Sequence, residues 1–235
     1  MENKAERFTM EAKGVSRLRL SRVARVGVAA WVVGVLWFYL AQLIVGARWS
    51  QPGYSWSTNN VSDLGNVHCQ MWAEDGHAAQ YVCSPLHNLM NATFILEGLV
   101  IIFGLWVIGS LWKKSISAHA SRVFLTLAGA GIIVAGLAPA DVSENVHVVL
   151  GAFFIFLFGN MGLLVAGKAV NHETLGGLRR LAPIFGGVGF AGGFLFFSYH
   201  YLGLGPGGME RVWGYVVPIW TFIVGGYGLY KSRTA

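Results

Sequence analysis

Charged side chains are scarce in this chain of 235 residues, of which 12% are charged and 54% are hydrophobic. A typical soluble domain carries about twice that share of charge, ~25%. Apolar runs of about 18 residues or more recur along the sequence, and each is long enough to cross a hydrocarbon core of ~30 Å. These runs use nearly the whole length, which leaves no room for a separate soluble domain. The composition therefore predicts one membrane domain.

The pattern of a cleavable signal peptide is also missing. The first apolar run begins only near Val23, extends to about Val45 and lacks a small-x-small exit, so we expect a first transmembrane helix there. The predicted fold class is all-α, an integral membrane bundle of six transmembrane helices with a long first extracytoplasmic loop. The spans are expected at about 23–46, 87–111, 122–140, 146–167, 181–203 and 211–230. The chain then divides into a basic N-terminal segment (1–22), a membrane domain (23–231) that includes the outer loop 47–86, and a tail (232–235).

The formal net charge of +6 does not indicate a nucleic-acid partner, because the basic residues gather in alternate loops. Fifteen of the seventeen Lys and Arg residues fall on one side of the predicted bundle, and only Arg48 and Arg211 fall on the other. Cytoplasmic loops of membrane proteins carry the excess of basic residues. Both termini, with segments 1–22 and 232–235, are therefore predicted to be cytoplasmic.

Cysteine occurs only twice, as Cys69 and Cys83, and both residues fall in the long outer loop. Two cysteines outside the membrane suit an oxidising compartment. A bridge between them would close a loop of about 15 residues and contribute ~3 kcal/mol. We predict this disulfide, with two unpaired thiols as the alternative.

Glycine gathers in the fifth and sixth predicted helices. The set comprises Gly186, Gly187, Gly189, Gly192, Gly193, Gly225, Gly226 and Gly228. Small residues let helix backbones approach closely in lipid. Packing within one chain explains these glycines, and the same faces would suit a homo-oligomer or a larger membrane complex.

Polar residues from several segments are expected to converge near the outer ends of the spans. They are Asn59, Asn60, Ser62, Asp63, Ser84, His87, Asn88, Asn91, Asp141, Glu144, His147, His200, Glu210 and Arg211. Helical spacing places Ser84, Asn88 and Asn91 on one face. The shared depth of these residues, rather than any single one, indicates a site.

Four interpretations of this cluster remain open. Asp63 or Glu210 with His147 would act as general acid and base on a lipid headgroup or carrier. Alternatively, His87, His147 and His200 with Asp63 or Asp141 would hold a divalent metal, although tight spacing such as His-x-x-x-His is missing.

The third interpretation is a b-type haem bound by two outer histidines. No other feature of the sequence supports it. The fourth is a buried polar network that only fixes the helix ends. We predict no cofactor.

Glu97 stands apart from this cluster, about ten residues into the second predicted helix. A charge near mid-membrane is costly and usually functional. On a helix Glu97 lies roughly 120° from the Asn91 face, so it does not have to join the outer cluster. The structural alternative is a protonated acid bonded to a neighbouring helix, with Asn160 as a candidate partner.

The sequence resembles a family of prokaryotic six-helix membrane proteins catalogued as domain of unknown function 998. The resemblance runs through Asn60-Val-Ser-Asp-Leu-Gly65, Ser84-Pro85, Asn91, Gly98, Gly136 to Pro139, His147, Gly208-Met-Glu-Arg211 and Trp220. Cys69, Cys83, His87 and His200 lie outside this pattern. The resemblance implies a multi-pass protein of a prokaryotic plasma membrane with a shared outer site, and it brings no established reaction.

From these residues we expect an outward-facing site that binds or modifies a lipid or lipid-linked substrate. Asp63, His147, Glu210 and Arg211 are the predicted catalytic residues, with Arg211 pairing an anionic group. The predicted substrate-binding residues are Asn60, Ser62, Ser84, Asn88, Asn91 and Asp141. The alternatives are a transporter or flippase that uses Glu97, and a non-catalytic subunit of a larger membrane complex.

The predicted topology can be measured with reporter fusions. Fusions after Lys114, Arg180 and Arg233 should score cytoplasmic, and fusions near Gln70 and Pro206 should score external, because the basic residues divide fifteen to two. A cytoplasmic score at Gln70 would overturn this topology.

Overall fold

A computed structural model describes residues 20–50, 52–72 and 79–233. The first three long helices are α2 (Arg22–Ala47), α3 (His87–Val107) and α4 (Ile116–Leu137). The fourth span runs continuously through α5 (Glu144–Val146), the π-helices η3 (His147–Ala152) and η4 (Ile155–Gly159), and α6 (Asn160–Ala169). The fifth combines α7 (His172–Leu175), the 3-10 turn η5 (Gly176–Arg180) and α8 (Leu181–Phe197).

The last span is bent. The helices α9 (Gly205–Gly214) and α10 (Val216–Arg233) meet at an angle of 45° around Tyr215. In the described part of the chain, five helices are long and apolar enough to cross a membrane, and the bent pair passes the same test when it is taken as one span. The predicted all-α membrane bundle is confirmed, with the sixth span broken where we expected a continuous helix.

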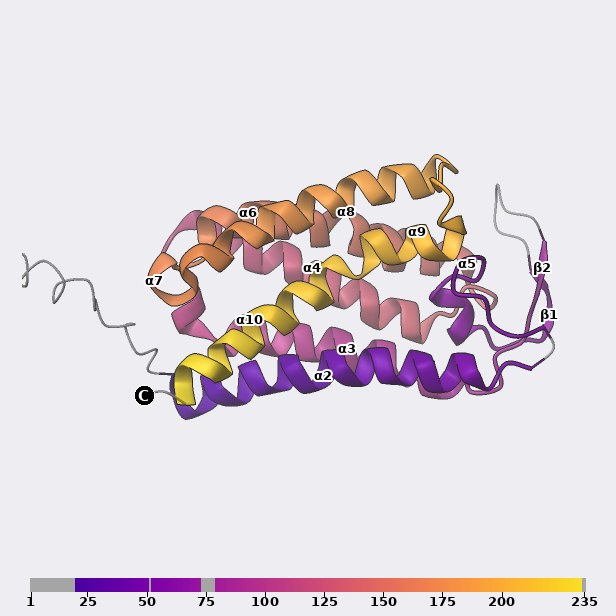
Figure 1. The fold of residues 1–235 in the computed structure, drawn as a ribbon, viewed down its shortest axis with the longest axis horizontal. Coiled ribbons are helices and arrows are strands. Elements are labelled where there is room, and N and C mark those ends of the chain that lie inside the picture. The colour runs from indigo at the N-terminus through magenta and orange to yellow at the C-terminus, as the bar shows by residue number, and fades with distance from the viewer. Residues whose placement is uncertain (1–19, 51, 73–78, 234–235) are drawn as a thin grey trace, which may run out of the picture.

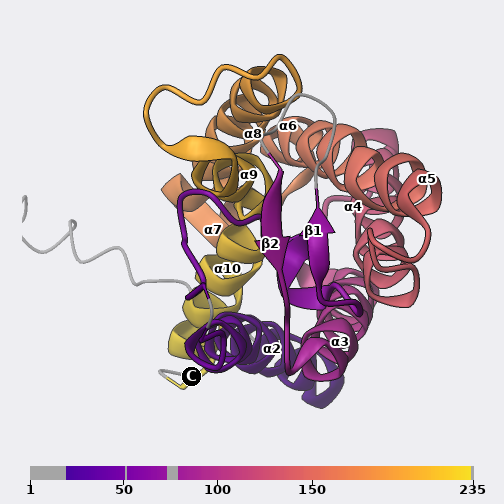
Figure 2. The same cartoon turned by 90° about the vertical axis from the view of Figure 1, so that its right-hand side faces the viewer.

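The helices form a closed ring around a packed core (Figures 1 and 2). Each span packs against its neighbour in the sequence, and α10 returns to α2. The start of α2 and the end of α10 lie at one end of the bundle, and the hairpin of β1 (Gln70–Trp72) and β2 (Gln80–Val82) lies at the other (Figure 1). We call the latter the hairpin end. This arrangement agrees with an even number of crossings, while the cytoplasmic side remains a prediction.

The hairpin is covalently closed. Its two strands pair antiparallel, with Gln70 opposite Val82, and a disulfide joins Cys69 to Cys83 just outside that pair. The predicted disulfide is therefore confirmed. It ties the two halves of the loop together before the chain enters α3.

Buried tryptophans fill the core near the opposite end. Trp220 of α10 packs against Trp31 of α2 and Trp112, with ring centroids 5.9 Å and 6.3 Å apart. The indole N–H of Trp31 donates to the carbonyl of Ile101 in α3 over 3.2 Å. Because Gly104 has no side chain, the Trp31 ring fits against the α3 backbone. These contacts close the ring of helices between α2, α3 and α10.

Glycines bring the helix backbones together in the way that small residues do in membranes. A Cβ on Gly186 of α8 would lie 2.8 Å from the carbonyl oxygen of Asn160 in α6. Gly189 likewise lies against the Asn160 side chain. By contrast, a Cβ on Gly187 or Gly226 would meet nothing within 4 Å. Much of the glycine pattern therefore serves packing inside one chain, and an oligomer remains a prediction.

Gly98 offers a direct test of this packing. A Cβ at Gly98 would collide with the carbonyl oxygen of Gly129 and would lie 2.7 Å from Ile133 Cγ1, so α3 and α4 would have to separate. We expect Gly98→Ala to lower the free energy of unfolding by about 1–3 kcal/mol, as overpacking does. Thermal unfolding in detergent measures this effect. Gly109→Ala is the matched control, since nothing lies within 4 Å of its Cβ position, and equal melting temperatures for the two variants would contradict the interpretation.

Candidate functional site

Two neighbouring cavities lie at the hairpin end of the bundle. The larger one, of about 430 Å³, lies between the segment 144–152 and the end of α8, and we call it the wide chamber. The smaller one, of about 60 Å³, is the narrow chamber. Ser62, His147, Ala152, Glu210 and Trp213 line both chambers, so the two meet at these residues.

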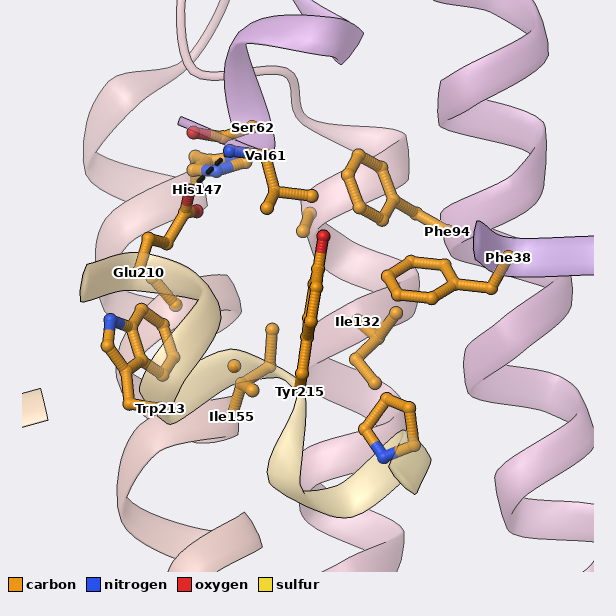
Figure 3. A pocket seen from close by; sticks show the side chains of 14 residues that line it. Phe38, Val61, Ser62, Phe94, Ile132, His147, Ile155, Glu210, Trp213 and Tyr215 are labelled. Carbon is orange, nitrogen blue, oxygen red and sulfur yellow. Dashed lines mark hydrogen bonds between the residues drawn. The ribbon is translucent and has the colours of Figure 1, made fainter. Parts of the chain in front are cut away.

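The narrow chamber is mainly apolar (Figure 3). Its walls include Phe38 of α2, Phe94 of α3, Ile132 of α4 and Ile155 of the fourth span. Tyr215, at the break between α9 and α10, closes a further side. The bend of the sixth span therefore helps to shape this chamber.

The wide chamber is about equally polar and apolar. Asn60, Glu144 and Asn145 contribute its polar groups, and Val149 and Tyr199 are among the apolar and aromatic side chains at its walls. Val149 is 55% exposed and Tyr199 is 50% exposed. The wide chamber is thus bordered by side chains that also reach the outer surface of the bundle.

His147 is held in one orientation at the junction of the chambers. Its Nδ1 lies 2.9 Å from the carbonyl oxygen of Ala138, so the ring donates a hydrogen bond through Nδ1. In the neutral ring the other nitrogen, Nε2, is then an acceptor. The π-helix η3 begins at His147, and π-helical turns inside α-helices occur frequently at functional sites.

Glu210 joins α9 to the loop that precedes the hairpin. Its carboxylate accepts hydrogen bonds from the backbone N–H groups of Val61 and Ser62 (Figure 3 shows the bond to Val61). These amides lie at the start of the 3-10 turn η1 (Ser62–Gly65). Glu210 therefore fixes the backbone of Ser62 beside His147 while it lines both chambers.

Arg211 lies outside the walls of both chambers. Its Nη1 donates to the carbonyl oxygens of Trp56, Asn59 and Gly207 over 3.0, 3.1 and 2.7 Å. Its Nη2 donates to the Tyr54 hydroxyl, and the guanidinium lies 4.9 Å from the centre of the Trp56 ring. The Arg211 side chain thus binds the first loop. From the sequence we had expected it to pair with an anionic ligand.

Asp63 also lies behind the site, with only 1% of its surface exposed. Its Oδ2 accepts hydrogen bonds from Asn59 Nδ2, the Asn60 backbone N–H and Gln80 Nε2 over 3.1, 3.0 and 3.2 Å. Asp63 therefore organises the loop and the hairpin and does not line either chamber. Its predicted catalytic role stays a prediction.

The other predicted binding residues divide in the same way. Ser84 donates to the carbonyl of Leu64, and Asn91 donates to that of Gly65, over 2.7 and 2.9 Å. Both bonds attach η1 to the start of α3. Asn88 is exposed and lines neither chamber. Asn60 and Ser62 do line the wide chamber.

Asp141 binds outside the chambers, since its carboxylate accepts from the His68 backbone N–H over 2.7 Å and lies 3.0 Å from His68 Nδ1. The histidines of the metal site considered above also contact different parts of the chain. Nδ1 of His87 lies 2.9 Å from the Ser84 carbonyl, and Nδ1 of His200 lies 2.6 Å from the Ser198 carbonyl. In residues 20–50, 52–72 and 79–233, no three His, Cys, Asp or Glu side chains form a group that could hold a metal ion.

Glu97 and Asn160 face different helices, so the considered pairing between them is not formed. The carboxylate of Glu97 lies against α2, where a Cβ on Gly34 would be 3.4 Å from Oε2. Asn160 donates to the carbonyl of Phe156 over 2.7 Å and packs on Gly189 of α8. Glu97 is only 1% exposed and has no hydrogen-bond partner in the described part of the chain.

The sequence had not pointed to the apolar part of the site. Phe38, Phe94 and Tyr215 belong to helices that read as ordinary spans, and Trp213 lies next to the break. The one local signal was Gly214-Tyr215 followed by Pro218, because glycine and proline interrupt helices.

These observations define a multi-pass α-helical membrane protein with a two-chambered site near one end of the bundle. A family model described as "Protein of unknown function (DUF998)" matches residues 32–227. The chain belongs to this family, as its sequence had suggested. No curated protein and no solved structure matches it.

The buried carboxyl of Asp63 gives a testable pH dependence. Burial raises the pKa of Asp63 to about 6 from an ordinary 3.8, despite hydrogen bonds from Asn59 and Asn60 that lower it. Between about pH 4 and pH 6, the folded chain keeps a proton on Asp63 that the unfolded chain has released. Its contribution to stability is therefore largest below this window, falls by about 3 kcal/mol across it and is constant above it.

The difference in unfolding free energy between the wild type and Asp63→Asn should follow this curve. Chemical denaturation in detergent at a series of pH values measures it, and the subtraction removes the titration of groups common to both proteins. A difference that rises with pH, or stays constant from pH 4 to pH 6, would contradict the assignment.

Proposed function

We propose that the protein binds a membrane amphiphile, a lipid or a lipid-linked compound, in the two chambers. The polar group occupies the wide chamber, and an apolar part enters the narrow chamber. The observation that carries this proposal is that a cavity with a mixed polar and apolar lining borders a mainly apolar one at His147, Glu210 and Ser62.

The sizes of the chambers suit such a ligand. Small-molecule sites commonly have volumes of ~300–1,000 Å³, and the wide chamber, at about 430 Å³, falls in that range. The narrow chamber, at about 60 Å³, has room for roughly four to six water-sized positions. This space suits an apolar group of a few carbon atoms, such as the end of a short or branched chain.

The position of the wide chamber favours entry from the membrane. Its wall includes Val148, Val149 and Phe197, which are partly exposed on the flank of the bundle. Apolar side chains at such a border would be in contact with lipid, so an amphiphile could move into the chamber without crossing water. The predicted topology assigns this entrance to the outer leaflet.

The polar residues at the junction give the site its chemistry. His147 presents an acceptor nitrogen, and Glu210 is kept in place by the Val61 and Ser62 amides. A hydroxyl or amine on the ligand would therefore find an acceptor at His147. The same pair would serve acid–base chemistry on a bound ligand, whereas Asp63 and Arg211 stabilise the loop behind it.

The transporter alternative has less support in the geometry. Both chambers lie at the hairpin end, and Glu97 and Asn160 line neither of them. A role as a subunit would use surfaces such as those at Gly187 and Gly226. The two chambers do not support that role. Binding of an amphiphile is therefore the function that uses the most of the observed site.

Filling the junction tests the proposal. Ala152 lines both chambers, so Ala152→Phe should block them and weaken binding of a fluorescent single-chain phospholipid at least about tenfold, which is a loss of ~1.4 kcal/mol. Equilibrium titration of the purified protein in nanodiscs measures the affinity. The matched control is Leu150→Phe, which adds a ring in the same π-helix at a position that is 43% exposed and lines neither chamber.

The control should bind the phospholipid as the wild type does. If Ala152→Phe keeps both the wild-type affinity and the wild-type melting temperature, the ligand does not occupy these chambers. Absence of any saturable binding in the wild type would likewise refute the proposal for this lipid class.

A further inference from the structure

Three buried polar side chains between α2 and α3 lack hydrogen-bond partners in the described part of the chain. They are Tyr39 through its hydroxyl, Thr93 through Oγ1 and Glu97 through both carboxylate oxygens. Thr93 and Glu97 are one helical turn apart on the same face of α3, and Glu97 lies against α2 at Gly34. Tyr39 belongs to α2, next to Phe38, whose ring packs against Phe94 of α3 one turn before Glu97.

This cluster is costly unless it has a use. A buried polar group without a hydrogen bond destabilises a protein, and an ionisable side chain inside a membrane is expensive in any case. Leu or Phe would fill the same space without that cost. Moreover, the groups are chemically complementary, because a phenol both donates and accepts while a carboxylate accepts.

The cluster lies directly behind the aromatic wall of the narrow chamber. Tyr39 packs edge-on against Tyr215, with ring centroids 5.0 Å apart, and Tyr215 lines that chamber. Phe38, the neighbour of Tyr39, and Phe94, one turn before Glu97, also line it and lie 6.2 Å apart between ring centroids. Tyr39 thus contacts the chamber wall through Tyr215 and belongs to the same α2–α3 interface as the acid.

We propose that Glu97 is an exchangeable proton site that is served from the narrow chamber through Tyr39. A proton from the chamber binds the Tyr39 oxygen, and the phenolic proton passes to the Glu97 carboxylate, either directly or through one bridging water. The phenol is restored, and the net change is one proton gained by Glu97. The reverse sequence releases it, so no other reactant is needed.

Few other titratable groups face Glu97. On α2 the titratable side chain of this cluster is Tyr39, and Tyr215, at the break between α9 and α10, packs against it. Helix α4, which packs against α3, carries His119 and Arg122 near its N-terminal end. There, Arg122 donates a hydrogen bond to the Leu105 carbonyl. Tyr39 is therefore the titratable group of this cluster through which a proton would reach Glu97.

Infrared spectroscopy of the protein in nanodiscs tests the inference without a known ligand. The wild type should show a protonated carboxyl band that is missing from Glu97→Gln and that shifts when the protein is transferred to D2O. Tyr39→Phe removes the hydroxyl and keeps the ring, so it should slow this exchange about tenfold, as expected for one hydrogen bond lost from the path. Tyr227→Phe, in α10 and outside the chamber wall, should exchange at the wild-type rate.

Dicyclohexylcarbodiimide gives a second measurement that requires no substitution. It reacts with protonated carboxyl groups in apolar surroundings, so mass spectrometry of the treated wild type should find the adduct at Glu97. The proposal is overturned if Glu97 carries no adduct, or if Tyr39→Phe exchanges as fast as the Tyr227→Phe control. Phospholipid binding in the chambers is measured separately, so a structural Glu97 would leave the proposed function untouched.

Discussion

The site depends on the attachment of the first long loop to α9 by two adjacent side chains. Arg211 binds the loop through the carbonyls of Trp56 and Asn59, and Glu210 binds it through the amides of Val61 and Ser62. One residue supplies donors to loop carbonyls, and the other supplies an acceptor to loop amides. Together they satisfy backbone groups that would otherwise be buried without partners.

The backbone of α9 approaches this loop closely enough for that exchange. A Cβ on Gly207 would collide with the Asn59 carbonyl, and Gly207 N–H donates to the Ser57 carbonyl over 2.9 Å. Gly205 adopts φ 74°, a left-handed conformation that favours glycine. The glycines of this segment therefore permit contact rather than flexibility.

The break in the sixth span lies beside this attachment. The helices α9 and α10 meet at 45° around Tyr215, where Pro218 has no N–H to pair with the Gly214 carbonyl, and α10 then packs against α2. The bend leaves Tyr215 and Trp213 around the narrow chamber, where a straight helix would place a continuous apolar face against its neighbours. The packed loop, the bend of the sixth span and the narrow chamber therefore lie next to one another in one arrangement.

Much of the fold was predictable because the membrane imposes a strict requirement. Backbone groups in hydrocarbon have to be paired internally, so long apolar runs become helices whatever their neighbours are. The six spans and the disulfide between Cys69 and Cys83 followed from local sequence and compartment alone. The ends of the spans were less predictable, as shown by the fifth, whose helical course begins at His172 instead of 181.

The shape of the site was decided only by tertiary structure. The sequence placed these polar residues near one end of the bundle, yet it could not tell that His147 and Glu210 face the cavities while Asp63 and Arg211 face the loop. Glu210 and Arg211 are adjacent in a helix, and neighbouring positions point about 100° apart, so their roles depend on which elements lie on each side. Polarity and depth are properties of the sequence, whereas the partner that each side chain meets depends on how the distant segments pack.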